Sequence, residues 1–220
     1  MTDWSVINLM NTTAPARRRR KNARPGELVA AALACFAERG FAATKLDDIA
    51  TKAGVSKGTV YLYFPSKDEL FKTVVRESLL PNIAQIEAML DGSDMPAAEQ
   101  LRRLLEFMTG RMASSPAGII PKLVITEAGN FPDIARFYLD TVVHRGFALI
   151  GGVLRRGIDS GEFRTVDVRH TTFCVIAPIL LTGLWRHSLA RFEPEALDAD
   201  ALWRMHAELI VRGLVRESAQ

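Results

Sequence analysis

Helical periodicity is the feature that most restricts the fold of this chain. From Gly26 onward, apolar residues recur at spacings of three and four residues, with no strand-like alternation of useful length and no internal repeat. This spacing places apolar side chains along one face of each helix, where they can be buried against other helices. The pattern therefore predicts an all-α fold. Glycines, prolines and loop residues divide the predicted helices at about 26–40, 44–54, 56–65, 66–90, 97–113, 117–128, 131–159, 167–190 and 198–216, with a kink at Pro81.

A tight turn separates the second and third of these helices. Gly54, in Ala53-Gly54-Val55, supplies the positive φ that such a turn needs, and Thr44 and Ser56 are placed to cap the two helices. Two short helices joined in this way, behind a preceding helix, form a helix-turn-helix. In that motif the second helix of the pair lies in the major groove of DNA, with its N-terminal residues at the base edges.

The segment that carries this motif, FAATKLDDIATKAGVSKGTVYLYFPSKDEL, resembles the DNA-binding domain of the tetracycline-repressor (TetR) family of bacterial regulators. The resemblance extends over about residues 26–72. It implies a three-helix DNA-binding domain at 25–72, followed by a larger helical domain at 73–220 that binds a small molecule and forms a homodimer.

The resemblance also implies DNA contacts, residue by residue. The matching positions are Thr44, Lys45, Ser56, Lys57, Gly58, Thr59, Tyr61, Tyr63 and Lys67. Lys57 and Thr59 are the candidates for base-edge contact, and Tyr61, Tyr63 and Lys67 are the family's phosphate-contacting positions. The alternatives are ordinary ones: lysines on a solvated surface, a packed aromatic ring at Tyr63, and helix caps at Thr44 and Ser56.

Positive charge is concentrated at the N-terminal end. Residues 1–72 carry 12 basic and 7 acidic side chains, whereas the remainder carries 16 basic and 18 acidic ones. This distribution indicates a polyanionic partner for that end alone. Residues 1–24 are polar and end in RRRRKNAR at 17–24, so we predict a disordered basic arm that lies on phosphates or in the minor groove. A solvated tail is the alternative.

No residue pattern predicts catalysis, a metal or a cofactor. The chain contains no glycine-rich phosphate loop, and its histidines have no partners at metal-site spacing. These histidines are His144, His170, His187 and His206. The chain is therefore not predicted to be an enzyme.

The sequence also predicts a cytoplasmic location without a membrane partner. The N-terminus lacks the basic region and apolar core of a secretory signal. The longest uncharged apolar stretch, residues 171–185, is too short to cross a bilayer and contains Pro178. Both cysteines, Cys35 and Cys174, lie in apolar runs and are expected to be buried thiols.

The last two predicted helices form the expected dimer interface. Because residues 171–185 carry no charge, more than one face of that helix must be covered. The final helix has an apolar stripe of Leu202, Met205, Leu209, Ile210 and Leu214. Two such helices and their copies would form a four-helix interface, in agreement with the family, although a core within one subunit would produce the same periodicity.

A ligand site is expected among the middle helices, which are rich in aromatic and methionine side chains. The candidate residues are Phe107, Met108, Met112, Phe137, Tyr138, His144, Phe147 and Trp185. Such stripes are more often plain core, but the resemblance favours a cavity.

Together these features predict a sequence-specific DNA-binding transcriptional regulator, a repressor that a small apolar ligand releases from a palindromic operator. The alternative is a DNA-binding architectural or partner-binding protein without a small-molecule effector.

Overall fold

The protein is described here by a computed structural model, which covers residues 25–216 apart from the side chains of residues 111–114. Its elements are α1 (Pro25–Arg39), α2 (Leu46–Ala53), α3 (Lys57–Tyr63), α4 (Lys67–Leu90), α5 (Ala97–Ser114), η1 (Pro116–Ile119), α6 (Ile120–Glu127), α7 (Pro132–Tyr138), η2 (Leu139–Val143), α8 (His144–Asp159), α9 (Val168–Arg186), η3 (Ala190–Phe192) and α10 (Ala199–Leu214). An isolated bridge between Phe163 and Val215 is the only β-type pairing within this range. The all-α prediction is confirmed.

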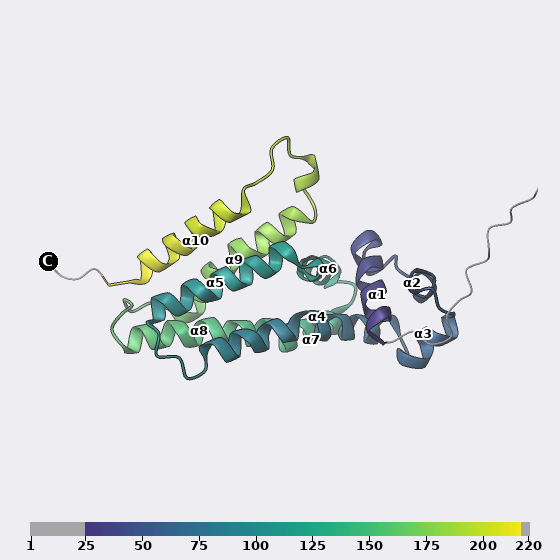
Figure 1. The fold of residues 1–220 in the computed structure, drawn as a ribbon, viewed down its shortest axis with the longest axis horizontal. Coiled ribbons are helices and arrows are strands. Elements are labelled where there is room, and N and C mark those ends of the chain that lie inside the picture. Colours follow the sequence, from purple (N-terminus) through teal and green to yellow (C-terminus); the bar gives the residue numbers. More distant parts are fainter. Residues whose placement is uncertain (1–24, 217–220) are drawn as a thin grey trace, which may run out of the picture.

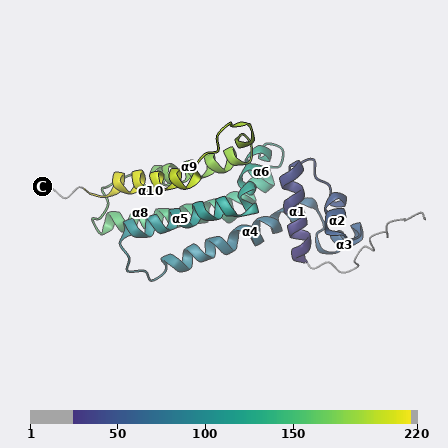
Figure 2. The ribbon, with the colours of Figure 1, turned by 45° about the horizontal axis from the view of Figure 1, so that its top comes forward.

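The helices form an elongated molecule with α1, α2 and α3 at one end (Figure 1). Helix α4 starts beside them and runs toward the opposite end, where α5, α8, α9 and α10 gather. The view turned by 45° keeps α1–α3 apart from this second group (Figure 2). The helix-turn-helix therefore occupies one tip of the molecule.

The helix predicted over 66–90 agrees with α4, and one other predicted helix differs from the structure in an informative way. Helix α4 continues through Pro81 as one element of 24 residues, and its N-cap Ser66 accepts a hydrogen bond from the Glu69 amide at 3.1 Å. The segment predicted as one helix over 131–159 is instead α7, a π-helical turn (η2) and α8. A π turn holds more residues than an α turn, so it shifts which residues share a face.

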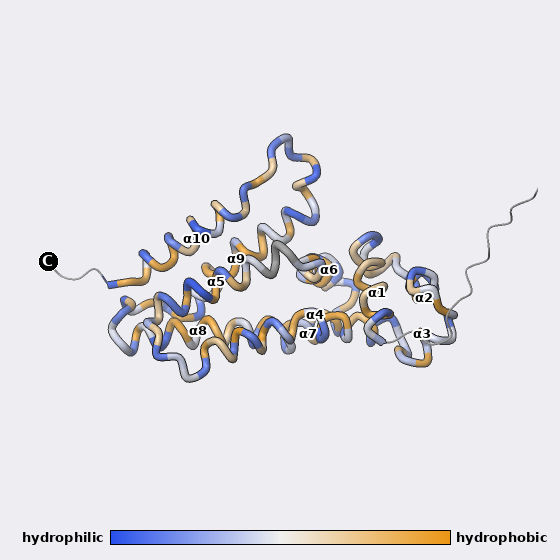
Figure 3. Tube along the Cα trace, in the orientation of Figure 1, coloured by the Kyte–Doolittle hydropathy of each residue, from blue (hydrophilic) through white to orange (hydrophobic). Residues whose placement is uncertain are grey.

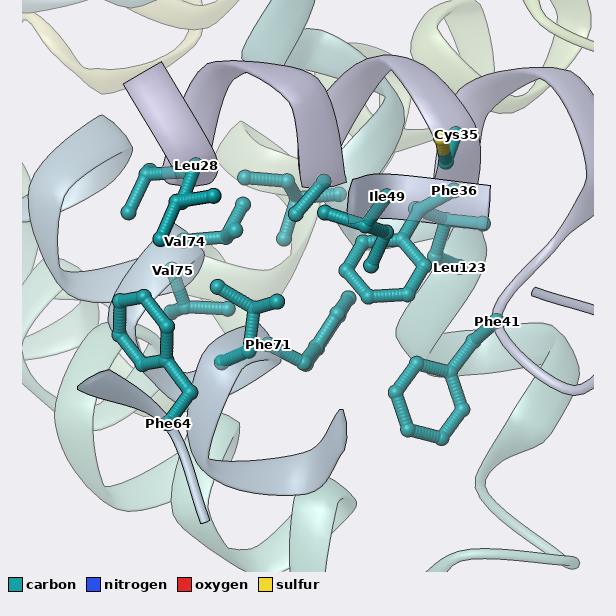
Figure 4. Close-up of a cluster of buried hydrophobic side chains, with 14 of the residues drawn as sticks. Leu28, Cys35, Phe36, Phe41, Ile49, Phe64, Phe71, Val74, Val75 and Leu123 are labelled. Carbon is teal, nitrogen blue, oxygen red and sulfur yellow. The ribbon is translucent and has the colours of Figure 1, made fainter. Parts of the chain in front are cut away.

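The first core holds the DNA-binding helices together. Its centre consists of three phenylalanines, Phe36, Phe41 and Phe71, whose ring centroids lie 5.0–5.4 Å apart in tilted and edge-on arrangements. Residues of η1, α6 and α7 belong to the same cluster, which includes Leu123 of α6 (Figure 4). The first core therefore continues past the predicted domain boundary at residues 72–73, which falls inside α4.

The second core lies between α5, α8, α9 and α10. Its fully buried members include Leu101, Leu104, Val153, Leu154, Phe163 and Val175. Gly157 lets Phe163 pack directly across α8, because a Cβ at residue 157 would lie 2.1 Å from the Phe163 ring. Along α10, hydrophobic and hydrophilic residues alternate in the helical manner that a half-buried helix requires (Figure 3).

Helix α9 is long and apolar enough, by length and composition, to cross a membrane. The helix reaches 19 residues because it extends beyond the uncharged stretch 171–185 and includes Arg169 and Arg186. Val175, Ile176 and Ile179 are buried in the second core, which accounts for part of its apolar character.

Candidate DNA-binding surface and ligand cavity

The turn and α3 have the geometry that the sequence predicts. Gly54 has a φ of +71°, and the Ser56 hydroxyl oxygen accepts a hydrogen bond from the Thr59 amide at 3.2 Å. Val60 and Phe64, four residues apart, are buried in the first core and dock α3 inward. The opposite face of α3 is therefore free to meet DNA.

That outward face carries Lys57, Gly58, Tyr61, Leu62 and Tyr63. Leu62 is 77% exposed, an unusual position for a leucine, and sequence reasoning missed it. A Cβ on Gly58 would meet only the Ser56 hydroxyl oxygen, at 3.8 Å. None of the described residues lies close enough to require glycine there, and the missing side chain leaves room for close approach of an external partner.

Two of the expected contacts, Thr44 and Thr59, point inward. Thr44 is 1% exposed, and its hydroxyl lies 2.7 Å from the Gly40 carbonyl and 3.2 Å from that of Cys35. Thr59 is 9% exposed, and its hydroxyl lies 2.8 Å from that of Ser56. Both side chains satisfy the protein's own polar groups, so the expectation of direct side-chain contact with DNA is corrected for both.

The basic side chains of the described DNA-binding domain are mostly held by other groups. Lys57 lies 3.0 Å from the Asp47 carboxylate, which raises the pKa of the lysine, and Lys52 pairs with Glu38. Lys45, which directly precedes α2, has no ion-pair or hydrogen-bond partner for its side chain within the described residues. Residues 25–72 carry six basic and six acidic side chains, so the N-terminal charge excess falls on the predicted arm, residues 1–24, which lies outside the described range.

Lys67 also departs from expectation. Its ammonium donates to the carbonyls of Phe41 (2.8 Å) and Ala42 (3.0 Å) and lies 4.5 Å from the Phe41 ring centroid. Burial lowers the pKa of this lysine. The predicted phosphate contact is therefore corrected, since the α1–α2 turn already holds the ammonium.

This contact belongs to a junction between the DNA-binding helices and the α6–α7 turn. The Glu127 carboxylate accepts a hydrogen bond from the Ala42 amide at 3.3 Å, and the Phe131 ring stands edge-on to Phe41 at 4.8 Å. We define the junction as Phe41, Ala42, Lys67, Glu127 and Phe131. Its residues are far apart in the sequence, and no spacing rule could have brought them together.

An apolar cavity of about 170 Å³ lies between α4, α5, η1, α8 and α9. Three of the predicted ligand residues, Phe107, Met108 and Tyr138, line it. The sequence analysis missed the polar wall residue Asn82 and also Gly146, where an added Cβ would meet nothing within 4 Å. The cavity prediction therefore located the right helices but not the full wall.

Four other candidates are placed elsewhere, which corrects their assignment. Phe137 packs against the guanidinium of Arg76, and Phe147 stands edge-on to Phe173 at 4.9 Å. The His144 side chain is mostly exposed beside Asp140, and Trp185 does not line the cavity. The remaining candidate, Met112, lies among the residues whose side chains are outside the description.

The outer surface of α9 and α10 is apolar. Phe173, Ala177 and Leu181 on α9 and Met205 and Leu209 on α10 are exposed, and we call these five residues the α9–α10 face. The two helices are joined where the buried His206 ring nitrogen lies 2.9 Å from the Val175 carbonyl oxygen.

The predicted dimer stripe divides between this face and the interior. Leu214 is buried in the second core and Ile210 packs against it, so both are corrected to intramolecular roles. Leu202 is half-buried. Cys35 is buried as expected, but Cys174 is exposed next to Phe173, so the expectation of a buried thiol was wrong for that residue.

Comparison with known proteins identifies the family. The family model for bacterial regulatory proteins of the tetR family matches residues 28–74, and the model for the C-terminal domain of AefR-like transcriptional repressors matches residues 99–202. The HTH-type transcriptional repressor KstR2 of Mycobacterium tuberculosis (strain ATCC 25618 / H37Rv) is 32% identical over 65% of this chain and 70% of its own length. The chain belongs to the tetR family.

Other relatives agree with this membership. The HTH-type transcriptional regulator RutR of Escherichia coli (strain K12) is 28% identical over 75% of this chain and 76% of its own length. The crystal structure of FadR from Bacillus subtilis in complex with stearoyl-CoA has the same fold, with a TM-score of 0.74 and 24% identity over 86% of this chain and 99% of that one. This tetR-family protein is a sequence-specific DNA-binding transcriptional regulator.

Proposed function

We propose that this regulator acts in the cytoplasm as a homodimeric repressor, which leaves a palindromic operator when a small apolar ligand fills the cavity. The carrying observation is that Tyr138 and Ala117 line the cavity and also belong to the first core, which holds the DNA-binding helices. A ligand in contact with these side chains therefore touches the packing that orients α1–α3. The stearoyl-CoA complex of FadR supports a small-molecule effector for a protein of this fold.

For DNA, the exposed face of α3 supports a division of roles. We assign base-edge contact to Lys57, and contact with a thymine methyl group to Leu62. Tyr61, Tyr63 and Lys45 are proposed to meet phosphates, because they are exposed around the start of α2 and along α3. Phosphate contacts fix the position of the protein, whereas base-edge contacts select the sequence.

The α9–α10 face supports the homodimer. Two recognition helices must reach successive major grooves about 34 Å apart, and a twofold dimer provides this spacing. Exposed Phe173, Leu181 and Leu209 would be costly to leave in water, and a twofold axis would cover each face with the same face of the partner.

The junction supports a route from ligand to DNA. Ala117, Gly118 and Pro121 of η1 and α6 line the cavity, and α6 ends at Glu127, whose carboxylate holds the Ala42 amide. A ligand that binds better when α6 is displaced would favour an arrangement of the dimer in which the two α3 helices no longer match the spacing of successive major grooves. A coupling of about 1–3 kcal/mol would change operator affinity by roughly 5- to 150-fold.

The proposal is tested first on DNA and then on ligand. Sequencing of genomic DNA captured by the purified protein, followed by footprinting, should give a small number of palindromic sites. Protection spread over many unrelated sequences would favour an architectural binder instead. Ligands that raise the melting temperature should then lower operator affinity, and stabilisation without any change in operator affinity would contradict release by an inducer.

A further inference from the structure

We infer that the cavity takes a neutral ligand of about one ring in size with one hydrogen-bonding oxygen, and that Tyr138 donates to that oxygen. This inference deepens the proposed function and rests on it, since it takes the cavity as the effector site. It identifies the chemical class of the ligand and the side chain that selects it.

Tyr138 lines the cavity, and its hydroxyl has no hydrogen-bond partner among the described residues. The side chain is 8% exposed. Across the described part of the chain, the indole nitrogen of Trp203 is the only solvent-inaccessible side-chain nitrogen or oxygen without a hydrogen-bond partner. The Tyr138 hydroxyl, also without a partner, therefore keeps contact with open space. Because Tyr138 lines the cavity, we assign this open space to the cavity.

The two other polar side chains of the wall each make one hydrogen bond inside the protein. The Asn82 side-chain amide donates to the Ser78 carbonyl at 3.3 Å, and the Ser115 hydroxyl oxygen accepts from the Ala117 amide at 3.1 Å. Burial raises the pKa of the Tyr138 phenol, so this group keeps its proton near neutral pH and can act as a donor. An unpartnered buried donor is costly, and a ligand oxygen would remove that cost.

The remaining wall determines the charge and size of the ligand. No charged side chain lines the cavity among the residues that the structure describes. A buried ion without a partner is strongly unfavourable, which disfavours carboxylates and ammonium groups. A volume of about 170 Å³ is close to that of cavities of about 150 Å³ that hold one benzene ring.

Gly146 offers a way to fill the same space from the protein side. Its Cβ would meet nothing within 4 Å, and the residue lies on α8 in the cavity wall. Gly146→Leu should therefore occupy the cavity without displacing the backbone. Gly26→Ala, in α1, is the matched control, because its Cβ also meets nothing and it lies outside the cavity wall.

The test uses acetophenone, its apolar counterpart ethylbenzene, and benzoate as the anion, each titrated against the full chain by calorimetry. Tyr138→Phe keeps the ring and removes only an unpartnered hydroxyl, so the variant should fold. We expect Tyr138→Phe to weaken acetophenone about tenfold while ethylbenzene affinity stays the same, in line with the net value of one hydrogen bond. Gly146→Leu should abolish binding of both neutral probes, and Gly26→Ala should change neither.

Three outcomes would overturn the inference: equal loss of both neutral probes in Tyr138→Phe, benzoate binding as tightly as acetophenone, or no binding of either neutral probe. Operator affinity is measured separately in the presence of acetophenone. Binding with the expected Tyr138 dependence but without DNA release would support this ligand class and count against the inducer mechanism. Release of DNA by acetophenone to the same extent in the wild type and in Tyr138→Phe would support the inducer mechanism and count against selection of the ligand by Tyr138.

Discussion

The two cores of this regulator are built differently. The first core is packed around the tilted and edge-on rings of Phe36, Phe41 and Phe71, and among its buried residues only Ala117 and Tyr138 line the cavity of about 170 Å³. The second core contributes more of its buried residues to the cavity wall. Protein interiors are normally close-packed, and unfilled volume weakens them. The difference indicates that the first core fixes the arrangement of the DNA-binding helices α1–α3, while the second leaves a space that a ligand can fill.

The largest test of this difference is Phe41→Ala. Phe41 is 1% exposed and touches both the first core and the junction, so removal of its ring should cost about 3–5 kcal/mol of unfolding free energy. Chemical denaturation measures the change. Leu62→Ala is the control, because that side chain is exposed and its loss should stay within about 0.5 kcal/mol. Similar losses of unfolding free energy for the two variants would mean that the Phe41 ring is not tightly packed in the first core.

The outer surface of the second core is tested by Leu209→Glu. A carboxylate on the α9–α10 face should be unfavourable in a dry interface, so the variant should sediment as a monomer. Operator binding should fall by roughly a hundredfold, which corresponds to about 2.7 kcal/mol. Arg204→Glu, on a different exposed side of α10, should remain dimeric. An intact dimer in Leu209→Glu would place the interface elsewhere.

Two glycines of α8 allow a tightly packed position to be compared with a position next to open space in the same helix. Gly157→Ala should destabilise the protein by about 1–3 kcal/mol, since the new methyl group would overlap the Phe163 ring. Gly146→Ala should stabilise it by up to about 1 kcal/mol, because alanine is the better helix former and the methyl group enters the cavity. Thermal denaturation of both variants provides the comparison, and the same sign of change in both would refute it.

The smallest expected effects concern salt dependence at the reading head. Lys45→Ala should reduce the salt slope of operator binding by about one unit, because Lys45 has no internal partner in the described structure. Lys67→Ala should leave the slope unchanged, since carbonyls of the α1–α2 turn hold its ammonium. Deletion of residues 1–24 should reduce the slope further than Lys45→Ala does, because six basic side chains are removed. A larger effect from Lys67 than from Lys45 would reverse our assignment.

Sequence reasoning succeeded where periodicity alone determines the outcome. The spacing of apolar residues predicted an all-α fold, and Gly54 predicted the turn between α2 and α3. It failed where the direction of a polar side chain depends on distant backbone atoms. The Thr44 and Lys67 side chains donate hydrogen bonds to carbonyls of the α1–α2 region, and neither bond can be predicted from the spacing of neighbouring residues.

The cavity was only partly predictable for a related reason. A π turn after Tyr138 changes the phase of the helix, so Tyr138, Val142, Gly146 and Ile150 all line the cavity at a constant spacing of four. A regular α-helix would rotate such a row steadily away from one face. The turn therefore brought Gly146 to the cavity wall, and a wheel drawn for a continuous helix did not reveal it.

Because the first core includes residues of η1, α6 and α7, the helices α1–α3 cannot be transferred alone to another protein with their packing intact. A chimera joined at residue 72 would leave Phe36, Phe41 and Phe71 facing foreign side chains from another protein's α6 and α7. Exchange of operator specificity between relatives should therefore work by replacement of the exposed α3 residues alone, or by transfer of residues 25–138 as one piece. Transfer of the first three helices without α6 and α7 should give insoluble protein.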